Sequence, residues 1–348
     1  MLLLTLLIWL SQPELHLQSM TQLQIPESSD FFLQNPLSFD IDAQGRIYLV
    51  DGEAKTIFVW KRDGSFLHTF GKPGQGPGEF TFSGHGPAIG FVTCVGERIF
   101  VFDGMQKKVS EFDQDGQFLS SPNLNLPRSR SHFFRAIDED TFLMLNRSMM
   151  EDHFVSRIES LDRSGKTLKM WREVKDDSVS FSMKDGRSRM TFKAYNPELL
   201  MAYRHSDQTL FLAQTGEPFL TAISPNGEQK TIQIKLTPKD VTEHDKDEFL
   251  LSRNGNRTRT PTFVFPETLP YFQKILPLKS GQLLIVLYDT PFTHKIQAIK
   301  IEQNGTILGK LDTKLGEGGA LLASRGQLMR CRLNEQAEFE CDLVKLEP

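Results

Sequence analysis

A cluster of cationic and aromatic side chains lies in the middle of the chain. Its members are close together in the sequence: Lys184, Arg187, Arg189, Phe192, Lys193 and Tyr195. A guanidinium can donate two parallel hydrogen bonds to a carboxylate or phosphate, and an aromatic ring offers a flat apolar surface to a ligand. The cluster therefore predicts a site for a carboxylate, phosphate or glycan ligand. The alternative is a solvated loop that packs one aromatic ring on its neighbour.

Groups that could form a metal centre are sparse. The eight histidines are scattered, without HxH or HExxH spacing. Only His132 lies at the start of an expected innermost strand, where its ring would face a central channel. Tyr271 begins another such strand and is a further candidate ligand-binding residue. A catalytic metal needs about three converging protein ligands, whereas the innermost strands offer only scattered carboxylates: Asp40, Asp42, Asp138 and Glu198.

Motifs for nucleophilic hydrolysis are missing as well, since the sequence contains no GxSxG or SxxK. We therefore predict no catalytic residues, no metal and no cofactor. Whether the protein is an enzyme stays open at this point, with a protein without catalysis favoured.

Two features that resemble ligand sites are better explained as structural. Gly71, Gly74, Gly76 and Gly78 do not match the GxxxxGK[ST] phosphate loop, and no helix is expected after them to supply amide donors. We interpret this segment as a tight linker. Asp51 and Asp103 end two strands just before a glycine, and such aspartates usually accept backbone N–H groups in the turn.

The elements that position these residues follow from an internal repeat. The chain has 348 residues, a length that alone suggests two domains. However, one unit of four strands recurs over residues 37–70 and 88–121 and in three later copies that end at positions 171, 234 and 311. The strands show period-2 alternation. A sixth copy begins at 319 and stops after its third strand.

A small residue pair that ends in glycine recurs before the fourth strand of each complete copy. The pairs are Asp63-Gly64, Asp115-Gly116, Ser164-Gly165, Asn226-Gly227 and Asn304-Gly305. Such pairs reach positive φ at little cost and suit two-residue hairpins. Six four-stranded antiparallel units in series predict an all-β, six-bladed β-propeller.

The last copy lacks a fourth strand, and the N-terminus contains a predicted strand that belongs to no other copy. Residues 15–25 alternate in hydropathy, so we predict that they close the ring as the outer strand of the last blade. In the same blade, Cys331 and Cys341 would face each other across a hairpin. They can form a disulfide after export, or remain two buried thiols. The third cysteine is Cys94.

Two stretches exceed what the blades require, at about residues 175–198 and 237–270. Both connect one blade to the next, so both should project from the same face of the ring. A short helix is expected near 239–252, with Val241, Phe249 and either Leu250 or Leu251 facing inward. Loops on a rigid scaffold often carry binding residues, which makes this face the candidate functional face.

The first residues of the chain are strongly apolar. Residues 1–14 include a run that is too short to span a bilayer but fits the core of an export signal. The run lacks a preceding cation and a clear cleavage site. We expect an exported protein, periplasmic or extracellular, with a cytoplasmic location as the alternative. The charges nearly balance, with 40 Lys and Arg against 44 Asp and Glu, which argues against a nucleic-acid partner.

Residues 31–80 resemble an NHL-type repeat. The matching features are the Asp-x-x-Gly-x-x-Tyr/Phe-Val-x-Asp core and the glycine-rich segment that closes the repeat. The whole chain is similar to six-bladed bacterial propellers of the NHL and TolB-like superfamily. The resemblance implies the fold, and it implies no particular activity, because propellers include both enzymes and scaffolds.

Two functional hypotheses follow. The favoured one is a monomeric, non-catalytic propeller that binds a protein, peptide or glycan ligand through the face with the two insertions. The alternative is an enzyme with its site at the channel mouth, a metal-assisted hydrolase or lyase of the lactonase-like propeller type.

Overall fold

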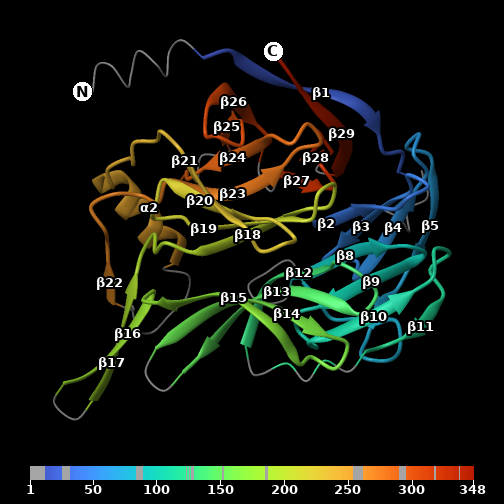
Figure 1. The fold of residues 1–348 in the computed structure, drawn as a ribbon, viewed down its shortest axis with the longest axis horizontal. Helices are drawn as coiled ribbons and strands as arrows, with labels where there is room; N and C mark the ends of the chain where they lie inside the picture. Colours follow the sequence, from blue (N-terminus) through green and yellow to red (C-terminus); the bar gives the residue numbers. More distant parts are fainter. Residues whose placement is uncertain are drawn as a thin grey trace.

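The computed structural model describes residues 12–348 apart from short gaps at 26–31, 84–88, 123, 125, 127–128, 151–152, 185–186, 254–261, 290–294, 317–318 and 337. Most of the predicted export segment, up to residue 11, thus lies outside the described residues. The repeat predicted from the sequence becomes six four-stranded antiparallel blades around a central axis (Figure 1). The all-β, six-bladed propeller is confirmed.

Blades one to five each run from an innermost to an outermost strand in chain order. Blade one contains β2 (Pro36–Ile41), β3 (Ile47–Asp51), β4 (Thr56–Trp60) and β5 (Phe66–Phe70). Blade two contains β8 (Gly90–Val95), β9 (Arg98–Asp103), β10 (Lys108–Phe112) and β11 (Phe118–Ser120). Blade three contains β12 (Ser129–Ala136), β13 (Thr141–Met149), β14 (Phe154–Asp162) and β15 (Thr167–Asp176).

The second half of the ring follows the same order. Blade four contains β18 (Leu199–Arg204), β19 (Thr209–Gln214), β20 (Phe219–Ile223) and β21 (Gln229–Gln233). Blade five contains β23 (Phe272–Pro277), β24 (Leu283–Leu287), β25 (Lys295–Ile301) and β26 (Ile307–Lys314). Blade six contains β27 (Ala320–Ser324), β28 (Gln327–Leu333), β29 (Phe339–Glu347) and, from the N-terminus, β1 (Glu14–Gln22).

The glycine hairpins between the third and fourth strands adopt the predicted conformation. All five glycines have positive φ, between 81° and 87°. Three of them, Gly64, Gly116 and Gly305, also touch the outer strand of the preceding blade so closely that a side chain has no room. A Cβ on Gly64 would lie 2.1 Å from the carbonyl oxygen of Gln22, and one on Gly305 would lie 1.9 Å from that of Gln233. Glycine is therefore required both for the turn and for the contact between blades.

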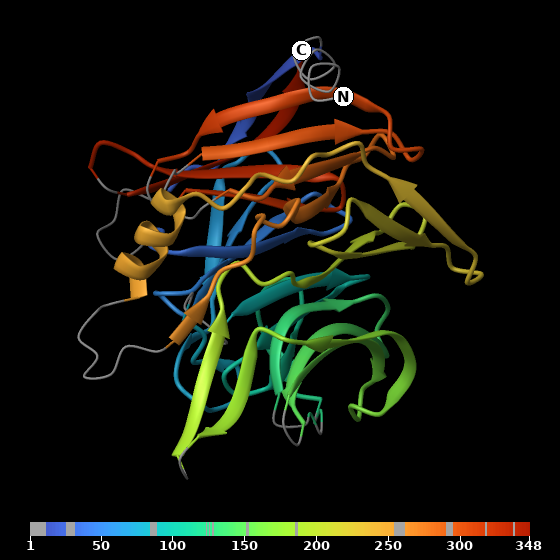
Figure 2. The same ribbon diagram turned by 90° about the vertical axis from the view of Figure 1, so that its left-hand side faces the viewer.

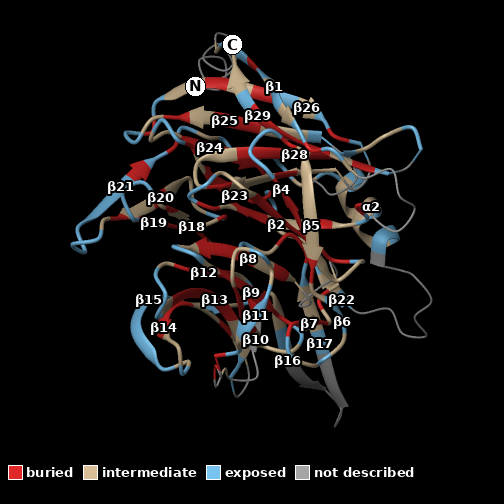
Figure 3. Ribbon diagram, turned by 90° about the vertical axis from the view of Figure 1, so that its right-hand side faces the viewer, coloured by how far each residue is buried: buried red, intermediate tan, exposed pale blue. Residues whose placement is uncertain are grey.

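Apolar packing between neighbouring blades forms the core. Seven buried clusters occur in the described residues, and six of them each fill one interface between two blades. Many contacts are between phenylalanines, such as the stacked rings of Phe102 and Phe134, whose centroids are 4.9 Å apart. The inner and middle strands are mostly buried, whereas outer strands such as β15 are largely exposed (Figure 3). Many of the 27 phenylalanines of the chain thus lie at the interfaces between blades.

The N-terminal strand closes the ring as predicted. β1 pairs antiparallel with β29, from His16 opposite Glu347 to Gln22 opposite Asp342. Its first residues also pair in parallel with β26, where Leu15 lies opposite Leu311. This second pairing was not foreseen, and it joins blades five and six into one eight-stranded sheet.

The hairpin of β28 and β29 has the register expected from the cysteines. Cys331 lies directly opposite Cys341, and Leu333 lies opposite Phe339. The two cysteines form a disulfide, and both are buried in the cluster between blades six and one. The remaining cysteine, Cys94, is a buried thiol.

The closing strand should contribute strongly to stability through Leu15. Its side chain is 6% exposed in the cluster between blades five and six, whereas Met20 on the same strand is 54% exposed. We expect Leu15→Ala to lower the free energy of unfolding by about 2–5 kcal/mol, because a buried leucine leaves a cavity. Met20→Ala should change it by less than about 0.5 kcal/mol. Equal losses for both variants in urea denaturation would contradict this account of closure.

The disulfide can be tested by thiol labelling of protein made in an oxidising compartment. After unfolding without reductant, we expect one cysteine per chain, Cys94, to react with a maleimide. After reduction all three should react. Three reactive thiols before reduction would show that Cys331 and Cys341 are not bonded.

Candidate functional site

The two insertions meet in a small sheet of their own. β16 (Val179–Lys184) and β17 (Arg187–Lys193) form a hairpin from the first insertion, and β22 (Thr262–Val264) of the second insertion pairs in parallel with β17. Phe192 lies opposite Phe263, and their ring centroids are 5.8 Å apart. We call β16, β17 and β22 the wing sheet. It extends beyond the ring next to blades three and four (Figure 1).

The second insertion also contains α2 (Glu243–Arg253), the helix expected near 239–252. It begins later than expected because Thr242 caps it: Asp245 N–H donates to the Thr242 hydroxyl, and the Asp245 carboxylate accepts from Thr242 N–H in return. Phe249 faces inward as predicted. Leu251 is 69% exposed, so the alternative that it faces inward is wrong.

The helix lies on the face opposite the β20–β21 hairpin (Figure 2). Connections between blades and turns between second and third strands share that side, which we call the insertion face. The other side, with the glycine hairpins and the turns between first and second strands, is the hairpin face. On the hairpin face, Gln114 of blade two donates from Nε2 to Oε1 of Gln44 of blade one over 3.1 Å.

Tyr195 anchors the insertions instead of offering a ring to a ligand. Its side chain is only 5% exposed and packs edge-on against Phe249, with ring centroids 5.2 Å apart. Its hydroxyl donates to the carbonyl oxygen of Asp245 over 2.6 Å. Burial raises the pKa of Tyr195 to about 12. The prediction of Tyr195 as an exposed ligand-binding residue is therefore wrong, because the second insertion covers it.

Three of the four cations named in the first insertion lie on β17, whereas Lys184 ends β16. Positions 187, 189 and 193 are separated by even numbers of residues, so they belong to the same face of this strand. The side chains of Arg187 and Arg189 lie outside those that the structure describes. Lys193 is half-exposed, and its Nζ is 3.9 Å from an Asp177 carboxylate oxygen. An exposed pair at this distance contributes little to stability, so Lys193 remains available to a ligand.

His132 lies at a β-bulge near the start of the innermost strand of blade three. The register between β12 and β13 shifts between Ser131 and Phe133, which leaves His132 as the extra residue, and its side chain is exposed. A similar shift occurs in blade five between Phe272 and Lys274. Bulges of this kind redirect side chains and are frequent next to functional sites. Both bulges lie toward the insertion face, where the innermost strands begin.

Tyr271 precedes the bulge of blade five and is only partly available. Its ring is half-buried and packs against the cluster between blades four and five. Its backbone N–H donates to Thr215 over 2.8 Å, and its carbonyl accepts from Tyr288 over 3.2 Å. The bond to Thr215 connects blades four and five, whereas the bond from Tyr288 lies within blade five.

Three further polar residues lie on the same side, and sequence reasoning did not predict them as binding residues. The carboxylate of Glu198, the ammonium of Lys274 and the hydroxyl of Tyr288 have no hydrogen-bond partner among the described residues. Desolvation and the nearby carboxylate of Asp176 raise the pKa of Glu198. Burial and Glu198 itself raise the pKa of Tyr288. Glu198 and Tyr288 are thus neighbours at the insertion face.

Lys274 is on β23, the innermost strand of blade five. Its side chain is exposed to solvent, yet protein surrounds it closely enough that desolvation lowers the pKa of the ammonium. The innermost strands border the ring axis, so solvent reaches Lys274 along that axis. A lone lysine between apolar residues of an inner strand was the available sequence signal.

Three of the four carboxylates considered as metal ligands, all except Glu198, have internal partners instead. Asp40 and Asp42 are buried; Asp42 accepts from Arg46 Nε over 2.7 Å and from the Tyr48 hydroxyl over 3.1 Å. Asp138 accepts the backbone N–H of Asp140 over 2.9 Å. In the described part of the chain, no group of three His, Cys, Asp or Glu side chains is arranged to hold a metal ion.

The structural explanations of the remaining motifs are confirmed. Asp51 accepts four backbone N–H groups, from residues 34, 35, 53 and 54. Asp103 accepts three, from residues 81, 105 and 106. The glycine-rich segment connects blades one and two, with β6 (Lys72–Pro73) and β7 (Glu79–Phe80) paired in parallel.

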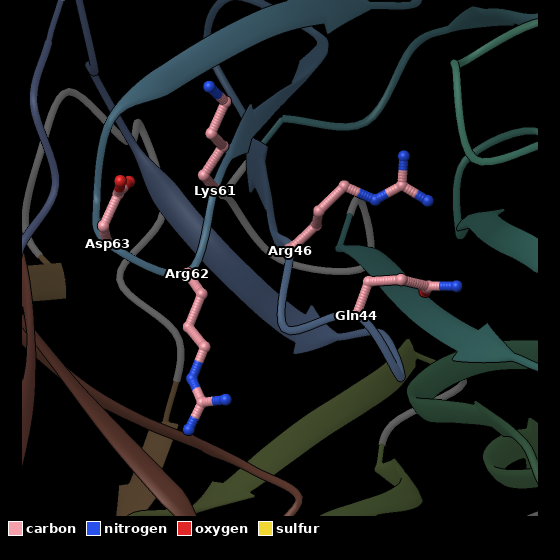
Figure 4. A pocket seen from close by; sticks show the side chains of 5 residues that line it. All are labelled: Gln44, Arg46, Lys61, Arg62 and Asp63. Atoms are coloured by element: carbon pink, nitrogen blue, oxygen red, sulfur yellow. The ribbon is translucent and has the colours of Figure 1, made fainter.

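A shallow hollow of about 420 Å³ lies on the hairpin face of blade one. Its lining side chains point in different directions rather than toward a common centre (Figure 4). They are Gln44, Arg46, Lys61, Arg62 and Asp63. Arg46 is committed to Asp42, so the hollow is a weaker candidate than the insertion face.

Together, a ring of six four-stranded blades with an elaborated insertion face defines a β-propeller of the six-bladed class. The family model described as "6-bladed beta-propeller", DUF5128, matches residues 27–311. The chain belongs to this family.

Solved structures share the fold at low sequence identity. A member of the DUF4221 family from Bacteroides vulgatus is 11% identical, with 97% of this chain and 99% of that chain covered and a TM-score of 0.59. A candidate exported protein from Bacteroides fragilis is 12% identical, with 96% of each chain covered and a TM-score of 0.58. No protein with a curated description matches this chain. Within the described residues, no helix is long and apolar enough to cross a membrane.

The role of Tyr195 as an anchor can be tested by hydrogen exchange. We expect Tyr195→Ala to increase exchange across α2 strongly, because it removes both the ring packing and the bond to Asp245. Tyr195→Phe removes only the hydroxyl and should cost about 1 kcal/mol of local stability. Unchanged protection of residues 243–253 in Tyr195→Ala would contradict the anchoring role.

Proposed function

We propose that this propeller is a monomeric binding protein that engages a protein, peptide or glycan ligand through its insertion face. The observation that carries the proposal is the accumulation of polar side chains on that one face. Glu198, Tyr288 and Lys274 lack hydrogen-bond partners among the described residues, and His132 is exposed at a bulge.

The wing sheet adds charge and apolar surface to the same face. β17 places three cationic positions, 187, 189 and 193, on one side of a strand. On the same side of the sheet, Val264 lies opposite Lys193 and is 51% exposed. A surface that combines cations with exposed apolar side chains is typical of a site for an acidic or amphipathic ligand.

We further propose that residues 15–348 act as a single domain, that the first blade is an NHL-type repeat, and that the protein is exported and binds no nucleic acid. Export is supported by the apolar start of the sequence and by the disulfide between Cys331 and Cys341, since disulfides persist in oxidising compartments. The description of the Bacteroides fragilis protein agrees with it. The balanced charge argues against nucleic acid.

The test is a charge-removal variant with a matched control. Arg187→Gln, Arg189→Gln and Lys193→Gln would remove three cations from the wing sheet. Lys61→Gln, Arg62→Gln and Lys166→Gln remove the same charge from the exposed hairpin face. Both variants and the wild-type protein are screened on an array of carboxylated and sulfated glycans and against a library of acidic peptides.

We expect ligands of the wild-type protein to lose at least about tenfold in affinity for the wing-sheet variant, because one charged hydrogen bond contributes about 1.5–3 kcal/mol. The control should retain them. Equal binding by both variants, or no ligand for the wild-type protein on either screen, would argue against the proposal. Near-ultraviolet circular dichroism of each variant separates a lost contact from a lost fold.

A further inference from the structure

A second polar cluster lies inside the ring, where the innermost strands end at the hairpin face. The carboxylate of Asp40 is fully buried and accepts from the Ser324 hydroxyl over 2.5 Å and from Arg325 Nε over 3.0 Å. It also accepts the backbone N–H of Cys94 over 2.8 Å. Ser324 accepts in turn from Arg135 Nη2 over 2.8 Å. These bonds join blades one, two, three and six, and blades three and six lie on opposite sides of the axis.

The charges of this cluster do not balance. Two guanidinium groups, Arg135 and Arg325, surround the one carboxylate of Asp40. Burial raises the pKa of Cys94, so its thiol stays neutral and adds no negative charge. Among the other nearby carboxylates, Asp42 pairs with Arg46 and Asp207 with Arg204, whereas Asp138 is exposed to solvent. One positive charge is left over, and one of the two arginines, Arg135, is only 7% exposed.

Two buried nitrogen atoms in the same place have no partner among the described residues. They are Nη1 of Arg135 and Nε2 of His205. Desolvation and the nearby guanidinium groups of Arg135 and Arg325 lower the pKa of His205 to about 3. The ring of His205 is therefore neutral and can carry its single proton on Nε2. The ring also packs edge-to-face with Tyr203, with ring centroids 5.0 Å apart.

We propose that this cluster binds a small monoanion of the size of chloride, held by Arg135 Nη1–H and His205 Nε2–H. A water molecule can satisfy both donors, but it leaves the excess charge uncompensated in a buried place, which is costly. A single negative charge removes that excess. A dianion such as sulfate would replace it with a negative excess, and so should bind less well.

The anion would connect blades that have no direct polar contact in this cluster. Arg135 belongs to blade three and His205 follows the innermost strand of blade four. Together with Asp40 of blade one and Ser324 of blade six, the site would join four blades at the axis. Its role is distinct from ligand binding on the insertion face, because it lies at the opposite end of the innermost strands.

The experiment compares anions at constant ionic strength. Thermal unfolding of the wild-type protein is followed in increasing sodium chloride, with sodium methanesulfonate making up the rest of the salt. We expect Tm to rise with chloride and to saturate, because a ligand that binds only the folded state stabilises it. The Tm is also measured separately in sodium sulfate, sodium formate and sodium acetate. A crystal soaked in sodium bromide should show an anomalous peak within hydrogen-bond distance of Arg135 Nη1.

Two variants and a control locate the effect. Arg135→Gln should abolish the chloride dependence of Tm, and His205→Phe, which keeps an aromatic ring, should weaken it. The control is Arg330→Gln, which breaks an ion pair with Asp342 on blade six and should retain the full dependence. His205→Phe decides the question if Arg135→Gln does not fold.

Equal Tm values in chloride and methanesulfonate, together with no bromide peak, would overturn the proposal and assign the space to water. A chloride effect that persists in both Arg135→Gln and His205→Phe would also overturn it, since the anion would then bind elsewhere. A stronger effect of sulfate than of chloride would contradict the charge argument.

Discussion

Apolar packing between neighbouring blades is the constraint on which the rest of this structure depends. Each blade buries both of its faces, so no blade is stable by itself and the ring must be complete. The requirement explains where the phenylalanines lie and why glycine occurs where Gly64 and Gly305 touch the preceding blade. It also explains the use of β1, since β29 would otherwise present an open edge.

Because the ring is rigid, its two faces can differ in chemistry. On the insertion face, chain segments without a role in the blades form a wing sheet and a capped helix around Tyr195. At the hairpin face, turns are short and the inner strand ends meet in a dense polar network around Asp40. One end of the channel is thus varied and solvated, while the other is closely hydrogen-bonded. Under the proposed function, that division places ligand recognition and ring stability at opposite ends.

Much of the fold could be predicted because its signals are local. The Asp63-Gly64 type of hairpin, the alternation of the strands and the missing fourth strand of the last copy all lie within single repeats. The polar network around Asp40 was harder to predict, because the residues in contact are distant in the sequence. Arg135 and Ser324 are 189 residues apart, and Asp40 and Ser324 are 284 apart. Tyr195 was misassigned for the same reason, since its cover comes from the other insertion.

The pairing of β1 with both β26 and β29 has a consequence for the order of folding. β1 precedes all six blades in the chain, whereas its partner β29 belongs to the sixth blade, since His16 lies opposite Glu347. Strand pairs of blades one to five can form while the chain emerges, but the ring stays open until β29 is available. During that interval β1 has no partner. A chaperone or an export machinery that holds the N-terminal segment would therefore delay closure without hindering the formation of individual blades.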